Sequence, residues 1–263
     1  VHHRAQANPM RVAFVGKGGA GKSAIAGTFA RFLARRGSPV LAIDSDPLPG
    51  LAYSLGLEID DAPPIPDEAV VEKAEGEEGP RFRLAEGLTA AAAVERYAIH
   101  APDGVRFLQF GKIKTDPRKH WRSQFAFRQI TRELPDEHWS LVGDLPGGTR
   151  QAFTGWGTYA RTVLVVVEPT AKGLLSARRL ARLSNLEHPP EEILAVASKV
   201  REPGDLDMVR EGTGLEVVAA VPWDEAFAES ERQAKAPIDA APDSAAVRAI
   251  ASLVERLDKE NER

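Results

Sequence analysis

The sequence contains no cysteine among its 263 residues. Structural disulfides, iron–sulfur clusters and thiolate metal sites are therefore excluded within this chain. The sequence also lacks an apolar run as long as a membrane span, and nothing in it resembles the hydrophobic region of a secretory signal. We therefore expect a cytoplasmic protein that has no membrane partner.

Neither sign of charge is in large excess, since the formal net charge is −4 at pH 7. This balance argues against bulk attraction to nucleic acid or to an anionic membrane. Hydrophobic residues make up 43% of the chain, which is enough for a sizeable core. Residues 1–9, with His2 and His3, resemble a tag remnant, so we take Met10 as the native start and residues 10–263 as a single domain.

The most informative stretch is residues 16–23, which read GKGGAGKS and are called the phosphate loop below. It follows the apolar run 12–15 and precedes the helical pattern 24–36, the context in which such a loop binds phosphates. Backbone N–H groups and the helix dipole favour an anion at this turn. Lys22 is expected to reach the β- and γ-phosphates of ATP, and the Ser23 hydroxyl to hold Mg²⁺. The residues expected to contact ATP or ADP here are Gly16, Gly18, Gly19, Ala20, Gly21, Lys22 and Ser23.

Lys17 makes the phosphate loop more specific. The string KGGxGKS resembles the deviant Walker A motif of the MinD/ParA superfamily of ATPases. The resemblance implies that Lys17 crosses a dimer interface and touches the nucleotide held by the other subunit, so we expect a homodimer. A further cation beside the phosphates would offset charge that develops during phosphoryl transfer.

Three aspartates come at or just after the ends of strand-like runs. Functional groups of open α/β sheets gather at the carboxyl ends of strands, so we expect these aspartates near the phosphate loop. The string DLPGG beginning at Asp144 resembles the switch II of the superfamily, which implies that Asp144 holds Mg²⁺. The string DSDP resembles its switch I, which implies that Asp46 positions or activates water and that Asp44 lies near Mg²⁺ or Lys17. The alternative for the second string is a simple aspartate-proline turn.

The base of the nucleotide is expected to meet two short segments. Members of the superfamily often have Asn-Lys after the strand that matches 193–197, whereas this chain has Ser198 and Lys199. A single serine hydroxyl cannot make the two-point contact of an amide. Pro222 and Trp223 resemble the later Ile-Pro-Tyr-Asp segment, so Trp223 either stacks on the base or belongs to a structural turn.

The branch of the superfamily is suggested by the string FGKI at 110–113, which resembles the segment before the Cys-x-Cys of the CooC nickel-insertion ATPases. The resemblance implies an accessory or maturation ATPase that serves an unidentified client or activator protein. Residues 114–120 contain no cysteine, so a thiolate metal site cannot carry over. Asp116 and His120 are alternative ligands, although a histidine in a basic stretch is more often solvated.

Two alternative functions remain open. The basic stretch 112–122 would suit a ParA-like positioning ATPase that binds DNA in a salt-sensitive way, although the net charge makes DNA the less favoured partner. A small-molecule kinase or ligase of the dethiobiotin synthetase type is the second alternative. Membrane positioning is not expected, because residues 253–263 are too polar to form an anchor.

Strand-like and helical patterns alternate along the chain. This order predicts an α/β fold of the P-loop NTPase class, with a mostly parallel central sheet, helices on both faces and right-handed crossovers. Residues 58–80 are acidic and rich in proline, and we interpret them as an irregular surface insertion. Further strands are predicted at 39–43, 105–110, 139–144, 162–167, 193–197 and 215–221, and further helices at 89–99, 172–185 and 244–257.

Overall fold

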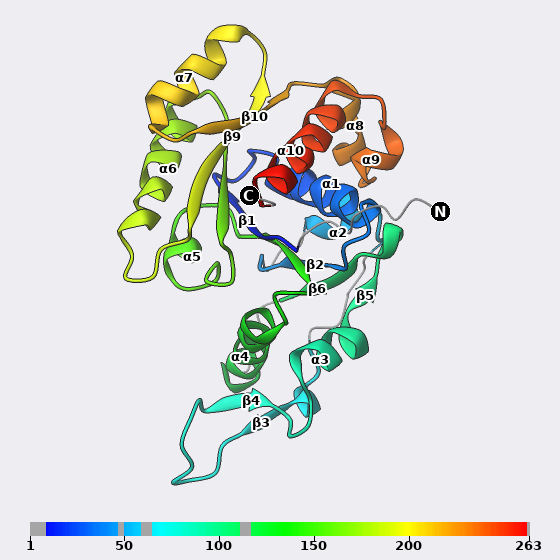
Figure 1. The fold of residues 1–263 in the computed structure, drawn as a ribbon, viewed down its shortest axis with the longest axis vertical. Coiled ribbons are helices and arrows are strands. Elements are labelled where there is room, and N and C mark those ends of the chain that lie inside the picture. Colours follow the sequence, from blue (N-terminus) through cyan, green and yellow to red (C-terminus); the bar gives the residue numbers. More distant parts are fainter. Residues whose placement is uncertain (1–8, 47–49, 59–64, 111–116, 262–263) are drawn as a thin grey trace.

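A central sheet organises the molecule (Figure 1), seen in a computed structural model that describes residues 9–46, 50–58, 65–110 and 117–261. The expected tag remnant therefore lies outside the described residues, apart from Pro9. The strands of the sheet are β1 (Arg11–Gly16), β2 (Val40–Asp44), β5 (Ile99–His100), β6 (Arg106–Gln109), β7 (Ser140–Asp144), β8 (Thr162–Val167), β9 (Glu192–Val200) and β10 (Val217–Pro222).

Within the described residues the sheet has eight strands in the order β10-β9-β8-β1-β7-β2-β6-β5. Every neighbouring pair is parallel except β5 with β6, so the predicted mostly parallel α/β fold is confirmed. All the predicted strand runs appear, with ends shifted by at most three residues. The two-residue strand β5 was not predicted.

Helices cover both faces of the sheet, as predicted. They are α1 (Lys22–Arg35), α2 (Leu51–Leu55), α3 (Ala90–Tyr97), α4 (Pro117–Glu133), α5 (Arg150–Phe153), α6 (Ala171–Ala181), α7 (Pro203–Thr213), α8 (Glu225–Arg232), α9 (Pro237–Ala240) and α10 (Ala245–Asn261). One core cluster joins α1, α2, α8 and α10 to the sheet, and a second joins α3, α4, α6 and α7 to the opposite face. Side chains of β1 alternate between the two clusters, with Val12 and Phe14 in one and Ala13 and Val15 in the other.

Local capping explains where several helices begin. The side-chain oxygen of Thr89 accepts the N–H of Ala92 at the start of α3, and Thr170 does the same for Gly173 at the start of α6. The predicted helix 172–185 ends earlier than expected, because a 3-10 turn (Arg182–Asn185) follows α6. In the part of the chain that the structure describes, no helix is both long and apolar enough to cross a membrane.

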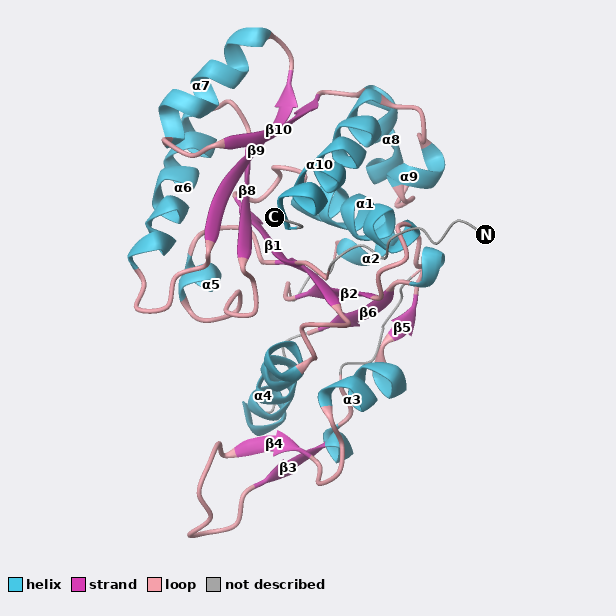
Figure 2. Ribbon diagram, viewed as in Figure 1, coloured by secondary structure: helices cyan, strands magenta, loops and turns pink. Residues whose placement is uncertain are grey.

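The acidic segment differs from the expected irregular insertion. A short 3-10 turn (Asp67–Ala69) leads into β3 (Val70–Glu72), which pairs antiparallel with β4 (Phe82–Leu84). Figure 2 shows this hairpin at the far end of α4, away from the main sheet. Its apolar side chains Val70, Phe82 and Leu84 are buried, and the N–H of Leu84 donates to Gln129 of α4 at 2.7 Å. These three residues stand among many charged ones, which is why composition alone indicated a loop.

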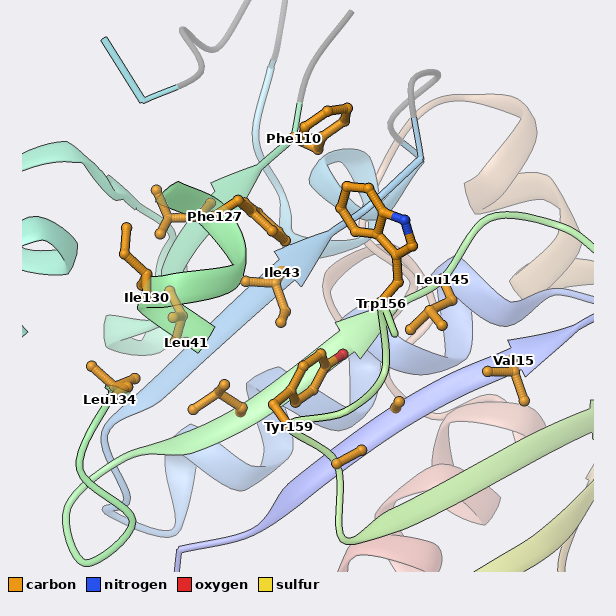
Figure 3. Packing of buried hydrophobic residues seen from close by; sticks show 14 of the residues in the cluster. Val15, Leu41, Ile43, Phe110, Phe127, Ile130, Leu134, Leu145, Trp156 and Tyr159 are labelled. Carbon is orange, nitrogen blue, oxygen red and sulfur yellow. The ribbon is translucent and has the colours of Figure 1, made fainter. Parts of the chain in front are cut away.

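A cluster of aromatic side chains fills the core beneath α4 (Figure 3). Phe110 and Trp156 meet edge to face with ring centres 4.9 Å apart, and Phe127 lies 6.1 Å from Trp156. Tyr159 lies against β7 at Gly143 (Figure 3). The loop between α5 and β8 is thus packed against α4 through the contact of Trp156 with Phe127.

Candidate nucleotide-binding site

The phosphate loop connects the end of β1 to the start of α1, as predicted. Gly16 has no room for a side chain, because a Cβ there would lie 2.5 Å from the carbonyl oxygen of Val166 in β8. Gly21 precedes α1 with a φ of 85°, a left-handed conformation that glycine adopts without strain. The loop glycines therefore allow a tight turn directly before α1, and the N-terminus of a helix favours an anion.

The turn after β7 lies directly against the phosphate loop. The N–H of Gly148 donates to the carbonyl of Gly16 at 3.0 Å. A Cβ on Gly147 would lie 3.0 Å from the Cα of Gly18 and 3.9 Å from the Nζ of Lys22. Lys22 itself is buried, and its amine is thus close to the turn that resembles switch II.

Asp44 and Asp144 lie side by side at the ends of neighbouring strands, since β2 and β7 pair them in register. The Ser23 hydroxyl donates a hydrogen bond to Oδ2 of Asp144. The other oxygen of Asp144, Oδ1, is buried and has no hydrogen-bond partner among the described residues. Asp44 accepts the N–H groups of Asp46 at 2.9 Å and of Leu51 at 3.0 Å.

Burial raises the pKa of both carboxyl groups, and a neighbouring carboxylate raises each of them further. Desolvation raises the pKa of Asp44 most, and the charge of Asp144 raises it further. Desolvation also raises the pKa of Asp144, while the charge of Lys22 and the hydrogen bond from Ser23 oppose this rise. A cation bound at this point would relieve the repulsion and favour the ionised carboxylates.

The oxygen atoms of this site fit Mg²⁺. Mg²⁺ prefers hard oxygen ligands and is usually held by one or two protein groups together with substrate phosphates. Ser23 Oγ and the unpartnered Oδ1 of Asp144 supply such ligands next to the phosphate loop. Among the described residues, no group of three or more His, Cys, Asp or Glu side chains is arranged so that it could hold a metal ion by itself.

The remaining predicted residues lie around the same edge of the sheet. Asp46 is half-buried, and its charge contributes to the raised pKa of Asp144. Lys17 is half-buried at the rim of the phosphate loop. Residues 112–116, with Asp116, lie outside the described residues, as do the side chains of residues 117–121, with His120.

Ser198 and Lys199 contact the backbone of the phosphate loop. The buried Ser198 hydroxyl donates to the carbonyl of Ala20 at 2.8 Å. The Lys199 amine donates to the carbonyl of Gly19 at 2.5 Å and to Oε1 of Glu168 at 2.5 Å. Glu168 was not predicted, although it comes directly after the strand 162–167 and hence at the sheet edge where functional groups gather.

Pro222 and Trp223 line a pocket beside the phosphate loop. The pocket is also lined by Gly21, Ile25, Ser198, Lys199 and Phe227. Trp223 is 37% exposed. The guanidinium of Arg201 lies 4.4 Å from the centre of its ring, another contact that sequence reasoning missed.

A comparison with known families decides the affiliation of this site. The CobQ/CobB/MinD/ParA nucleotide binding domain matches residues 12–238. The chain belongs to this family. The predicted MinD/ParA resemblance is thereby confirmed, and a nucleotide-binding domain of this family spans all the predicted site residues.

Individual relatives agree with the family assignment. An uncharacterized ATP-binding protein of Methanocaldococcus jannaschii is 29% identical over 233 residues, which cover 84% of this chain and 88% of that protein. The carbon monoxide dehydrogenase accessory protein CooC of Rhodospirillum rubrum is 24% identical over 268 residues, covering 94% of this chain and 97% of CooC.

Solved structures of MinD share the fold. The septum site-determining protein MinD of Pyrococcus horikoshii, complexed with Mg-ADP, superposes with a TM-score of 0.70 at 17% identity, covering 96% of this chain and 97% of that one. The MinC:MinD complex of Aquifex aeolicus contains a chain that superposes with a TM-score of 0.68 at 18% identity, covering 94% and 95%. At these identities the likeness concerns the fold.

Proposed function

We propose that this chain is a Mg²⁺-dependent ATPase that works as a dimeric switch in the maturation or assembly of another enzyme or complex. The observation that carries the proposal is the meeting of Lys22, Ser23 and Asp144 at one point of the sheet edge. Phosphoryl transfer requires a turn that binds phosphates, a cationic side chain beside it and a carboxylate that can hold Mg²⁺. The phosphate loop, Lys22 and Asp144 supply these groups.

The residues predicted to meet the phosphates, Mg²⁺ and the attacking water each have a role in this proposal. Lys22 binds the phosphates, and Ser23 and Asp144 hold Mg²⁺, with Asp44 beside them. When bound, Mg²⁺ supplies neutralisation of the phosphate charge. Asp46 orients the attacking water, and Lys17 adds a cation to the nucleotide site of the partner subunit.

The accessory role is supported by the similarity to CooC, which extends over nearly the whole of both chains. CooC is a carbon monoxide dehydrogenase accessory protein, and the proposal carries an accessory role of that general kind to this chain. The metal chemistry of thiolates is left out of the proposal, because the sequence has no cysteine. The client protein would distinguish the nucleotide-bound dimer from the open form.

The first experiment compares ATP binding by the parent chain, Lys22→Ala and the control Lys172→Ala, whose residue is exposed on α6. We expect calorimetry to show a loss of at least about tenfold in affinity for Lys22→Ala and none for the control, since charge-assisted hydrogen bonds to phosphate are lost. Unchanged affinity of Lys22→Ala would contradict the proposed site.

The second experiment tests the switch. Light scattering of Asp46→Asn with ATP and Mg²⁺ is expected to show a dimer, and adding Lys17→Ala is expected to return it to a monomer. Affinity capture from cell extract with the ATP-bound Asp46→Asn protein would then recover the client. Transfer of phosphate to a small molecule instead of water would favour the kinase or ligase alternative.

A further inference from the structure

Two consecutive carbonyl groups of the phosphate loop are held by two consecutive residues at the end of β9. Ser198 donates to the carbonyl of Ala20, and Lys199 donates to the carbonyl of Gly19. The two segments are about 180 residues apart in the chain, since the hydrogen bonds span 178 and 180 positions. The end of β9 therefore acts on the backbone of the phosphate loop.

Holding a carbonyl also orients the N–H of the same peptide. A trans peptide is planar, and its C=O and N–H groups point in opposite directions. The hydrogen bond from Ser198 to the carbonyl of Ala20 thus fixes the direction of the N–H of Gly21. The bond from Lys199 to the carbonyl of Gly19 fixes the preceding peptide, whose N–H, on Ala20, closes a turn onto the carbonyl of Lys17 at 3.2 Å. Phosphate binding depends on the direction of such N–H groups.

The backbone of Lys199, the residue whose amine donates to the carbonyl of Gly19, has a strained conformation. Its φ is 59°, a left-handed conformation that a residue with a side chain rarely adopts. Such strain persists where surrounding contacts over-determine it, and it gathers at functional sites. Here the contacts are the Gly19 carbonyl and the Glu168 carboxylate. The charge of Lys199 also acts on Glu231 of α8. Burial raises the pKa of Glu231, and the charge of Lys199 opposes this rise.

We propose that Ser198, Lys199 and Glu168 are positioning residues of the phosphate loop. They act on the nucleotide through the peptides of Gly19 and Ala20, with Glu168 holding the amine of Lys199 in place. The proposal revises the expectation that Ser198 reads the base, since its single O–H donor is committed to the loop. It rests on the proposed function, because it assumes that the loop binds phosphates.

The test separates phosphate affinity from base affinity with two probes, Mg-ATP and Mg-tripolyphosphate, the second of which has no base. Ser198→Ala and Lys199→Gly are expected to bind both probes about three- to tenfold more weakly, the range expected from loss of one hydrogen bond. Trp223→Ala serves as the control, because Trp223 lines the pocket beside the phosphate loop where the base is expected. It is expected to weaken Mg-ATP binding and leave Mg-tripolyphosphate binding unchanged.

Lys199→Gly also separates positioning from folding. Glycine adopts the left-handed backbone readily, so the variant is expected to unfold at a temperature no lower than the parent chain while it binds tripolyphosphate more weakly. Glu168→Gln keeps an oxygen acceptor for the amine and is expected to retain more affinity than Glu168→Ala. The ratio of ATP to GTP affinity is expected to stay constant in all four variants of the three positioning residues.

Several outcomes would overturn the inference. If Ser198→Ala changes the ATP to GTP ratio and leaves tripolyphosphate binding intact, Ser198 reads the base. If both probes bind Ser198→Ala and Lys199→Gly as tightly as they bind the parent chain, the two residues do not position the phosphate loop. If the parent chain binds neither probe, the proposed function fails together with this inference.

Discussion

Replacing Gly143 of β7 by alanine is expected to destabilise the fold strongly, because Tyr159 occupies the space that a side chain would need. A Cβ at this position would lie 1.5 Å from the hydroxyl oxygen of Tyr159, 2.7 Å from its Cζ and 3.3 Å from Cγ1 of Ile43. Figure 3 shows Tyr159 and Ile43 on the same side of the sheet. The backbone of Gly143 is outside the left-handed region, so the requirement for glycine here is one of room.

The size of the effect follows from the enclosure of the site. Overpacking a closed core costs about 1–3 kcal/mol, and a contact of 1.5 Å in a buried cluster places Gly143→Ala near about 3 kcal/mol. Tyr159→Phe alone is expected to be neutral or to stabilise by about 1 kcal/mol. Its hydroxyl is buried with no hydrogen-bond partner among the described residues, and an unpaired buried polar group carries a desolvation cost. The same burial raises the pKa of Tyr159, which keeps the hydroxyl neutral.

The assay is urea unfolding of the two single variants and the double variant. Tyr159→Phe removes the oxygen and leaves the 2.7 Å contact, so the double variant should recover part of the loss, with a coupling of about 1–2 kcal/mol. Gly204→Ala is a matched control, because a Cβ there meets no atom within 4 Å and the residue lies in the first turn of α7. Equal stability of Gly143→Ala and the parent, or strict additivity in the double variant, would refute the packing argument.

Three further predictions concern the aspartates of the site. Chelation of Mg²⁺ with EDTA should remove most of the thermal stabilisation by ATP, and Asp144→Asn should do the same with Mg²⁺ present. A thermal-shift series in which ATP stabilises the parent equally with and without Mg²⁺ would contradict the assignment. Asp46→Asn should lower kcat by about 100-fold and leave ATP affinity within about threefold, because a group that orients water acts on the reaction step. Phosphate release at the parent rate would exclude that role. Asp44 has a higher pKa in the folded chain, about 8, than in the unfolded chain. Its contribution to the stability of the nucleotide-free fold is therefore fully present below about pH 4 and is lost as the pH rises to about 8. Asp44→Asn should therefore reduce the fall in unfolding free energy between about pH 5 and about pH 8, and equal slopes in urea unfolding would argue against it.

The parts of the site that sequence reasoning placed well are those defined by local pattern. The phosphate loop lies between β1 and α1 because the motif, the preceding apolar run and the following helical pattern are contiguous. Asp44 and Asp144 were expected to meet because parallel strands end at one edge of a sheet, and their strands are indeed neighbours in register.

The parts that sequence reasoning missed depend on contacts between distant segments. Ser198 could be located at the end of a strand, but nothing local shows that its hydroxyl meets Ala20, 178 positions away. The need for Gly143 is set by Tyr159, whose position follows from how the loop after α5 packs on β7. The β3–β4 hairpin was concealed by charged neighbours, because only a few of its side chains are buried.

The proposed switch depends more on contacts near the phosphates than on contacts to the base. ATP and ADP have the same base and differ in one phosphate, so a contact to the base stabilises both states equally and shifts no equilibrium between them. Discrimination must come from groups near the terminal phosphate, and here Gly147 of the turn after β7 packs on Gly18 and approaches Lys22. Because Ser198 stands where the resemblance implies an asparagine that reads the base, the chain lacks a contact that such a switch does not need. Ser198 instead supports the phosphate loop, where a difference of one phosphate can be sensed.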